Sequence, residues 1–548
     1  MTSENTSLRL TIESLAPDGL GLAHVEGFPL KFAGTLPGEE VMVSIDRTKR
    51  PWRGEVLDIL TPSPLRRTLT CPHIEEAPRC GGCPWGMVTP EGQATLKRQL
   101  TLDALSAEGI SAPSEVIHHS ATQQAGYRSK ALFTLIKNGD TWLWGLYANG
   151  SHEVVVTPVC QAIPNWMNSV AGVIATVLGK TDLTPYDEKT HQGDVRSLLL
   201  REGVNREGKV ERLVSLILRN VTEKTLSLLK NPLLEALLPW DVKVVSLYEH
   251  TTRGNAVLGE KEYFLTEAHT ISTTIDGAEF AVGSSTFLQI HREQMLALYQ
   301  EALNWAEIEP GDTFLDLYCG VGTMTILGAR QATKSIGVDV VEASIAAARE
   351  NAKRNQIANA EFFAGTVETV LPSLIVKGVR ADKMIVDPAF KGMEASVPAM
   401  IKALSPRRLV YVSCNPKSFA RDAKRLLELG FKLERLATFD LFPDTAHVET
   451  VCLLVLRNPV THINIDVDVE ELVQDKRGQA TYDQIRDYVK EQTSLHVTNL
   501  NIAQTKRKFG IIERENYNLP KSEDSKQPNC TKEKEEAIKE AFKHFGLL

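Results

Sequence analysis

The second half of the chain alternates between short apolar runs and stretches with helical spacing. Apolar runs end in DLYCG near residue 316, GVDV near 337, VDPAF near 386 and VSCNP near 412, and a last run, VETVCLLVLR, starts at 448. Strands that alternate with helices predict a doubly wound α/β sheet. In such sheets ligands bind at the carboxyl ends of the strands, so the polar residues that follow these runs are expected to meet in one crevice.

One of these strand ends has the features of a nucleoside-binding turn. Gly320 and Gly322 directly follow the apolar run, and Asp339 lies nineteen residues after Gly320, at the end of the next run. Glycines let the backbone approach a cofactor, and an acidic residue at this distance binds ribose hydroxyls. A dinucleotide fingerprint would have a third glycine where this chain has Thr325. The pattern therefore favours S-adenosylmethionine, which has no phosphate.

Cys414 stands at the end of another apolar run, directly before Asn415 and Pro416. A buried structural thiol is one interpretation, because free cysteine often behaves as a small hydrophobic residue. The other is a nucleophile, whose thiolate would be favoured by the helix that follows and by Lys417 and Arg421. On this second interpretation, the pKa of Cys414 should be lowered.

A methyl donor beside a strand-end cysteine suits one reaction in particular. Carbon 5 of uracil is too electron-poor to attack a sulfonium methyl group, but addition of a thiolate to carbon 6 makes it nucleophilic. A base must then remove the proton from carbon 5, and the target nucleotide must be flipped out of its helix. Glu449, in LFPDTAHVETV, is the candidate base, although an ordinary exposed glutamate at a strand end fits the pattern equally well.

The N-terminal region, residues 1–62, has the pattern of a small β-barrel. Apolar and polar residues alternate in SLRLTIESL and EEVMVSIDR, and turn sequences separate them. RTKRPWR, at 47–53, is the most concentrated basic stretch of this region. Because the whole chain has a net charge of −8, binding of RNA would have to depend on such local patches.

Four of the eight cysteines cluster in residues 63–270, which are expected to form a mixed α/β central domain. Cys80 and Cys83 form a C-x2-C pair around two glycines, Cys71 precedes them and Cys160 follows much later. Four thiolates fit either a tetrahedral zinc ion or an iron–sulfur cluster, and their spacing does not separate the two. Reactive cysteines without a metal are the third alternative.

The rest of the chain sets broader limits. The N-terminus has no apolar signal segment, and no run approaches the length of a membrane span, so we expect a cytoplasmic protein with no membrane partner. Residues 271–458 should form the catalytic α/β domain. Residues 459–548 have helical spacing, with a predicted capping box from Thr481 to Gln484, and form either an RNA-contacting appendage or a helical cap.

Taken together, these motifs resemble the RNA uracil-5-methyltransferase family over roughly residues 5–458. The resemblance is carried by DLYCGVG, VDPAFKG, YVSCNP followed by ARD, and LFPDTAHVE, in the family's order, with an N-terminal barrel similar to the TRAM domain, which has an oligonucleotide-binding-type fold. It implies a multi-domain α/β protein that methylates carbon 5 of a uridine in 23S ribosomal RNA, and we expect a monomer. It implies catalytic roles for Cys414 and Glu449. It further implies S-adenosylmethionine contacts from Gln289, Tyr318, Asp339 and Asp387, and a [4Fe-4S] cluster on Cys71, Cys80, Cys83 and Cys160.

The chain departs from the family's usual motifs at several positions. Phe390 stands where arginine is usual, Asp444 replaces His, Gln or Tyr, His291 replaces a frequent Asn, and Ser418 replaces Thr. None of these changes removes a reacting group. The remaining alternatives are the same chemistry on transfer RNA and a non-catalytic RNA-binding or folding factor.

Overall fold

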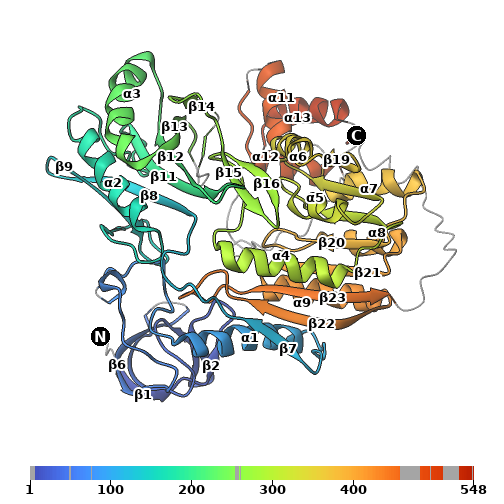
Figure 1. The fold of residues 1–548 in the computed structure, drawn as a ribbon, viewed down its shortest axis with the longest axis horizontal. Helices are drawn as coiled ribbons and strands as arrows, with labels where there is room; N and C mark the ends of the chain where they lie inside the picture. Colours follow the sequence, from blue (N-terminus) through green and yellow to red (C-terminus); the bar gives the residue numbers. More distant parts are fainter. Residues whose placement is uncertain are drawn as a thin grey trace. The chain divides into compact units, whose positions relative to one another are not determined.

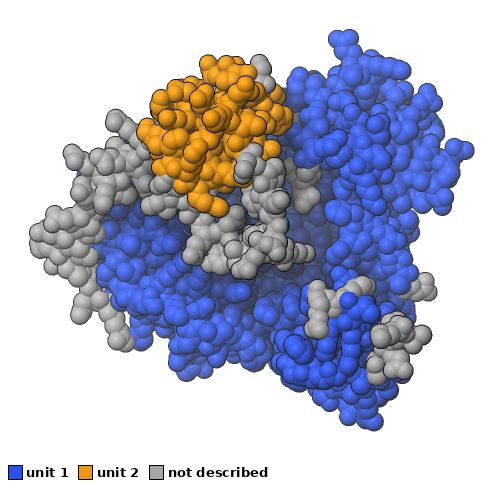
Figure 2. Space-filling view, turned by 180° about the vertical axis from the view of Figure 1, so that it is seen from behind, with its two compact units in different colours: residues 1–461 blue, residues 462–548 orange. Residues whose placement is uncertain are grey.

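The computed structural model describes residues 6–48, 51–75, 77–253, 258–259, 261–456, 482–493, 495–509, 530–545 and 547–548. The chain divides into two compact units, Met1–Thr461 and His462–Leu548, which Figure 2 colours separately. Figure 1 labels the helices and strands.

The largest sheet of the first unit has eight strands in the order β19-β18-β17-β20-β21-β23-β22-β7. β23 is antiparallel to both of its neighbours, and the other seven strands run parallel to one another. The strands are β17 (Thr313–Leu317), β18 (Lys334–Asp339), β19 (Ala360–Ala364), β20 (Lys383–Val386), β21 (Arg408–Ser413), β22 (Phe431–Phe439), β23 (Glu449–Leu456) and β7 (Val116–His119).

Helices pack on both faces of this sheet, as doubly wound topology requires. Alternate side chains of each strand point to opposite faces, so Val410 and Val412 join one core and Leu409 and Tyr411 join the other. The first face is covered by α4 (Arg292–Ala306), α5 (Thr323–Ala329) and α6 (Glu342–Arg354). The second is covered by α7 (Val367–Val376), α8 (Val397–Leu404), α9 (Pro416–Glu428) and the end of α1 (Pro90–Ala107). The doubly wound sheet predicted from the sequence is therefore present (Figure 1).

The edge strand β7 comes from the segment that the sequence analysis assigned to the central domain. It pairs in parallel with β22, with Leu436 opposite Val116. Helix α1 precedes it and packs beside α9. The segment between the barrel and residue 119 therefore extends the catalytic sheet rather than the central one.

A second sheet has seven strands in the order β10-β9-β8-β11-β12-β13-β14. Its core includes Phe133, Leu198 and Leu216 and is covered by two helices. The elements are β8 (Lys130–Asn138), β9 (Thr141–Tyr147), β10 (Val154–Val156), α2 (Asn165–Leu178), β11 (Val195–Val204), β12 (Val210–Leu218), α3 (Glu223–Leu237), η2 (Leu238–Trp240), β13 (Val242–Glu249) and β14 (Lys261–Phe264). The hairpin of β15 (Ile271–Ile275) and β16 (Ala278–Val282) follows.

The N-terminal strands form two three-stranded sheets, β1-β5-β6 and β2-β3-β4, that share one core around Phe32, Val41 and Val43. These are β1 (Thr6–Thr11), β2 (Ser14–Leu15), β3 (Gly21–Val25), β4 (Phe28–Phe32), β5 (Glu40–Asp46) and β6 (Arg53–Thr61), and the short helix η1 (Pro72–Ile74) comes after them. Two residues of RTKRPWR, 49 and 50, lie outside the described residues.

The second unit contains α11 (Tyr482–Thr493), α12 (Asn499–Lys508) and α13 (Lys532–His544). Ile485, Ile502 and Phe542 are fully buried in its core. Thr498 and Asn501 form a capping box at the start of α12. Thr481, the first residue of the capping box predicted before α11, lies outside the described residues.

Candidate active site

Three neighbouring strands bring Asp387, Cys414 and Glu449 to one edge of the eight-stranded sheet. Asp387 and Cys414 each follow the last residue of a parallel strand, β20 and β21. Glu449 is the first residue of β23, which is antiparallel to β21, with Thr450 opposite Ser413. The residue after Ser413 and the residue before Thr450 therefore lie side by side, although 35 positions separate them in the chain.

The strand pleat also sends these side chains to the same face. Ile385, Val412 and Val451 belong to the core under α4, and side chains two positions apart share a face. Each of these core residues lies two positions from a site residue, namely Ile385 from Asp387, Val412 from Cys414 and Val451 from Glu449. They therefore meet between the sheet and α4, and the electrostatic influence of both carboxyl groups on the thiol agrees with this placement.

Glu449 is held in an environment that disfavours its charge. Its side chain is 3% exposed, and its Oε2 atom has no hydrogen-bond partner among the described residues. Burial, followed by the nearby Asp387, raises the pKa of Glu449 to about 8. Burial raises the pKa of Asp387 to about 7. Two carboxyl groups with pKa values near neutrality can each accept or release a proton at physiological pH. Glu449 is thus a buried glutamate, not an exposed one at a strand end.

The predicted lowering of the Cys414 pKa is wrong for the protein without ligands. Burial, followed by the charges of Glu449 and Asp387, raises the pKa of this thiol to about 12. Of the two cations expected to lower it, Arg421 instead donates hydrogen bonds to the Asp422 carboxylate, 2.8 Å away, and to the Lys391 carbonyl. Asp387 and Glu449 are far from Cys414 in the sequence, but their carboxyl groups lie close to its thiol in the folded sheet.

The turn after Cys414 is fixed by its own polar groups. Asn415 caps α9 by accepting a hydrogen bond from the Lys417 N–H, and Pro416 occupies the first helical turn, where a missing N–H costs nothing. The Asn415 side chain also donates to the Phe390 carbonyl, at 2.9 Å. Ser418, which replaces the usual Thr, donates to the same carbonyl at 3.1 Å. The nucleophile turn and the turn after β20 are therefore tied together.

The predicted cofactor turn lies at the ends of β17 and β18. Tyr318, Gly320 and Gly322 all have positive φ angles of 66°, 53° and 82°, so the backbone coils tightly here. The Gly320 N–H donates to the Asp339 carboxylate at 2.9 Å, which joins the two strand ends. Apart from Gly320 and its chain neighbours, no described residue has an atom within 4 Å of where a Cβ on Gly320 would stand, so the turn opens onto free space.

Gln289 precedes α4 and is 8% exposed, and its amide has no hydrogen-bond partner among the described residues. The departure at His291 has a structural role, because its ring accepts from the Gln294 N–H at the start of α4. An unpartnered amide, a ribose-binding carboxylate and an open glycine turn fit S-adenosylmethionine, whose ribose and amino acid ends need such groups.

Two buried residues of this crevice were missed in the sequence. Asp316, on β17, accepts a hydrogen bond from Thr325 at 2.6 Å, and burial raises its pKa to about 7. Tyr299, on α4, is buried, and burial followed by Asp387, Asp316 and Glu449 raises its pKa. The apolar spacing of α4 makes Tyr299 indistinguishable from a core residue, whereas Asp316 could have been found as the acidic residue before the glycine turn.

The four clustered cysteines line a separate cavity of about 130 Å³. None of them forms a disulfide. Burial raises the pKa values of Cys80, Cys83 and Cys160, and Cys160 contributes to the rise for the other two. Among the described residues, no group of three or more His, Cys, Asp or Glu side chains is arranged to hold a metal ion. The four cysteines that the sequence analysis grouped do line one cavity. The [4Fe-4S] cluster stays a prediction.

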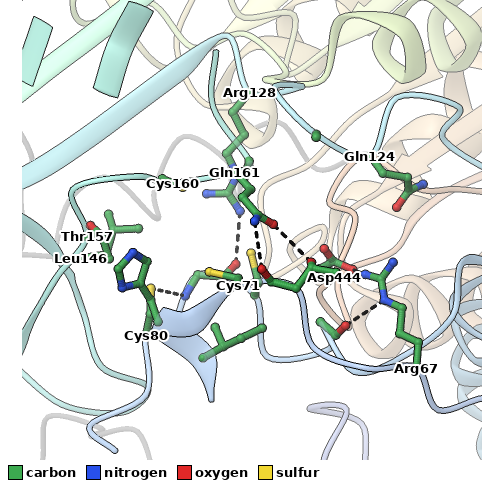
Figure 3. A pocket seen from close by; sticks show the side chains of 18 residues that line it. Arg67, Cys71, Cys80, Gln124, Arg128, Leu146, Thr157, Cys160, Gln161 and Asp444 are labelled. Carbon is green, nitrogen blue, oxygen red and sulfur yellow. Dashed lines mark hydrogen bonds and ion pairs between the residues drawn. The ribbon is translucent and has the colours of Figure 1, made fainter. Parts of the chain in front are cut away.

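Two arginines and Asp444 complete the walls of this cavity (Figure 3). The partly buried Arg128 counteracts the rise in the pKa values of Cys83 and Cys160. Arg67 forms an ion pair with Asp444. The Gln93 side chain donates to Asp444 and accepts from its N–H, both at 2.8 Å. The departure at Asp444 thus anchors the loop that leads to Glu449.

The fold and the crevice define an S-adenosylmethionine-dependent methyltransferase. The family model for tRNA (Uracil-5-)-methyltransferase matches residues 261–457, and that for the TRAM domain matches residues 2–56. An "Uncharacterized RNA methyltransferase" of Bacillus cereus is 31% identical over 82% of this chain and 97% of its own length. A protein of the same description from Halalkalibacterium halodurans is 31% identical over 83% and 98%.

Among solved structures, the tRNA (uracil-54, C5)-methyltransferase of Pyrococcus abyssi, in complex with S-adenosyl-L-homocysteine, has a similar fold. Its TM-score is 0.65 at 22% identity, over 82% of this chain and 100% of that one. The chain belongs to the RNA uracil-5-methyltransferase family, as its motifs predicted. In the part of the chain that is described, no helix is long and apolar enough to cross a membrane.

Proposed function

We propose that this enzyme methylates carbon 5 of a uridine in 23S ribosomal RNA through a covalent bond between Cys414 and carbon 6. The observation that carries the proposal is the meeting of Cys414, Glu449 and Asp387 at adjacent strand ends, where one buried carboxyl oxygen of Glu449 has no hydrogen-bond partner within the described parts of the chain. A buried, unpartnered oxygen costs free energy in folding, which is a common property of groups that await a substrate.

The first half of the reaction needs the Cys414 thiolate. Because the thiol is neutral in the free enzyme, it must give its proton to a neighbouring carboxylate as it bonds to carbon 6. Asp387, with a pKa of about 7, is ionised in about half of the molecules at neutral pH and can take that proton. The Cys414 thiol thus stays protonated and unreactive until a flipped-out uracil enters the crevice and lies against it.

The second half of the reaction needs Glu449. When bound, S-adenosylmethionine would supply an electrophilic methyl group, whose bond to the sulfonium sulfur breaks as carbon 5 takes the methyl group, with S-adenosyl-L-homocysteine as the leaving group. Glu449, as a carboxylate, then removes the hydrogen from carbon 5, the bond between the Cys414 sulfur and carbon 6 breaks, and the thiolate leaves. The raised pKa of Glu449, about 8, makes it a stronger base than an exposed glutamate.

The cofactor half of the crevice assigns roles to four side chains. Asp339 would accept hydrogen bonds from ribose hydroxyls, since its carboxylate is already oriented by the Gly320 N–H. Tyr318 and Gln289 would contact the remaining parts of the cofactor. Asp387 lies between the cofactor turn and Cys414, so we place it in contact with both the cofactor and the uracil ring.

The ribosomal target is supported by the TRAM domain together with the four clustered cysteines, a combination that resembles the ribosomal RNA branch of the family. Transfer RNA is the second candidate, because the tRNA (uracil-54, C5)-methyltransferase of Pyrococcus abyssi has a similar fold over 82% of this chain. A non-catalytic factor is disfavoured by the intact catalytic residues.

We also propose that Cys71, Cys80, Cys83 and Cys160 hold a [4Fe-4S] cluster. Zinc would require four sulfur atoms at about 2.3 Å from one point. The four thiols line one cavity beside the partly buried Arg128. A four-iron cluster spaces its thiolates more widely, and its negative charge is compensated by Arg128. The cluster would supply structural support for the surrounding loops.

The target is tested by mapping 5-methyluridine. Purified enzyme is incubated with unmodified 23S ribosomal RNA and, separately, with unmodified transfer RNA, and the products are mapped by mass spectrometry. We expect methylation of the ribosomal RNA alone, dependent on S-adenosylmethionine and absent in the Cys414→Ala variant. Methylation of transfer RNA alone would replace the first candidate by the second. No methylation of either would refute the enzymatic proposal.

A further inference from the structure

A groove of about 520 Å³ lies beside the nucleophile turn, outside the catalytic crevice. One wall is the turn of residues 390–395 after β20, and the other is the first part of α9. Asn415 belongs to the lining, so the groove begins one residue from Cys414. Its volume lies within the range of ligand-binding pockets, about 300–1,000 Å³.

Phe390 is the prominent side chain of this groove. This residue is 61% exposed, so its ring is accessible to solvent. Its backbone is not free, because its carbonyl accepts hydrogen bonds from both Asn415 and Ser418. These bonds fix the Phe390 backbone relative to the nucleophile turn and leave the exposed ring available to a ligand.

Four basic residues also line the groove. Lys391 and Lys417 are both exposed, and neither has an ion-pair partner among the described residues. Arg421 and Arg425 also line the groove, but they contact the buried Asp422. The acidic lining residues are Glu108 and Glu394, and the first of these pairs with Lys424. Two lysines next to an exposed aromatic ring therefore give the groove a local excess of free positive charge.

We propose that this groove binds the single-stranded RNA adjacent to the target uridine, with Phe390 stacking on an unpaired base and Lys391 and Lys417 contacting phosphates. This inference rests on the proposed function. When the target uridine flips out, the neighbouring base loses its stacking partner. The Phe390 ring, beside the nucleophile turn, takes the place of that partner. Aromatic platforms flanked by cations are the usual means of holding single strands. At this position, a stacking ring takes the place of the family's usual arginine.

Equilibrium binding of RNA tests the platform. The probe is a short single-stranded oligoribonucleotide with one uridine between two 2-aminopurine bases, whose fluorescence falls on stacking. Phe390→Ala should bind about tenfold more weakly and lose the quenching of one fluorescent base. Phe390→Tyr should restore both properties, because it keeps the ring. Val376→Ala is the matched control, since it shortens another apolar side chain that is 73% exposed, at the end of α7.

The lysines are tested through the salt dependence of binding. Lys391→Ala and Lys417→Ala should each reduce the slope of log K against log salt by about 0.7, the value for one phosphate contact on a single strand. S-adenosyl-L-homocysteine should bind all of these variants as it binds the unmodified protein. An unchanged slope in both variants would show that neither lysine contacts a phosphate, which contradicts this part of the proposal.

Two results would overturn the inference. One is equal binding and equal quenching in Phe390→Ala, Phe390→Tyr and the unmodified protein. The other is tighter binding of a poly-glutamate peptide than of the oligoribonucleotide, competing at the groove, which would assign it to an acidic protein. Either result leaves 5-methyluridine formation by the unmodified enzyme intact, so a failure of this inference is distinguishable from a failure of the proposed function.

Discussion

The strand-end crevice and the cysteine cavity position their sulfur atoms by different means. Cys414 follows a strand whose two neighbours are both hydrogen-bonded to it, so its position is set by the register of β20, β21 and β23. Cys71, Cys83 and Cys160 lie in irregular segments, and Cys80 forms only an isolated bridge with Ala148. The crevice is therefore built without its ligands, whereas the cavity, formed mostly by irregular segments, is expected to gain rigidity from the proposed cluster.

This contrast has consequences for mutation. In the crevice, a side chain can be removed while the sheet keeps its shape, so chemistry is lost and structure is retained. In the cavity, one thiol supports the position of several loop segments, so structure is expected to be lost first. The following four predictions test this contrast from the largest expected effect to the smallest.

Cys414→Ala should abolish methylation, by a factor of about 10⁴ or more, because it removes the proposed nucleophile. Binding of RNA and of S-adenosyl-L-homocysteine should remain, since the half-buried side chain adds little to the core. Steady-state turnover measures the loss. Cys452→Ala, in the buried interior of β23, is the control and should stay active. A fully active Cys414→Ala enzyme would refute the covalent mechanism.

Glu449→Gln should slow turnover by about 10²–10⁴-fold, the usual contribution of a positioned base. Addition of the thiol and methyl transfer can still proceed, but the hydrogen on carbon 5 is removed poorly. A covalent complex with methylated RNA should therefore accumulate and appear as a slow band on a denaturing gel. The band should require both Cys414 and S-adenosylmethionine. Loss of turnover without any such band would show that Glu449 acts before the covalent bond forms.

Cys80→Ser should remove most of the iron from protein purified without oxygen, from about four atoms per chain to near none. The loops around residues 70–89 should then be cleaved faster by proteases, while methylation falls less than in Glu449→Gln. Cys530→Ser makes the same chemical change in the second unit and should retain all the iron. One zinc atom per chain and no iron in the unmodified protein would contradict the cluster assignment.

The smallest effect concerns pH. Since Glu449 acts as a carboxylate and its pKa is about 8, the methylation rate should rise with pH through that value. The charge of Asp387 is one cause of the raised pKa, so Asp387→Asn should move the midpoint to lower pH. The shift should be modest, because burial is the larger cause. Normalised pH–rate profiles measure it, with the exposed Asp103→Asn as control. A midpoint that moves upward would mean that another group controls the profile.

Much of the crevice could be predicted because strand ends are visible in sequence. Asp339, Asp387 and Cys414 each follow an apolar run, and parallel strands bring such positions to one edge. The pairing of Glu449 with Cys414 was predicted from a resemblance, since neither spacing nor hydrophobicity reveals that β23 enters the sheet antiparallel to β21.

Other features could not be predicted because they depend on distances across the fold. The thiol of Cys414 is surrounded by carboxyl groups from other strands, whereas the sequence displays only the cations next to it. Strand β7 pairs with β22 across more than 300 positions, and four residues have too short a pattern to identify an edge strand. Tyr299 has the spacing of a core residue on α4.

The insertion of β23 has a consequence for the biosynthesis of the enzyme. β23 is the last strand of the eight-stranded sheet to be translated, yet it lies between β21 and β22, both of which precede it in the chain. A growing chain that has just completed Cys414 lacks both the base and a central strand of its sheet. At about 5–20 residues per second, several seconds pass before Leu456 is added. The proposed nucleophile thus acquires its proposed base only when the last strand of this sheet has been made.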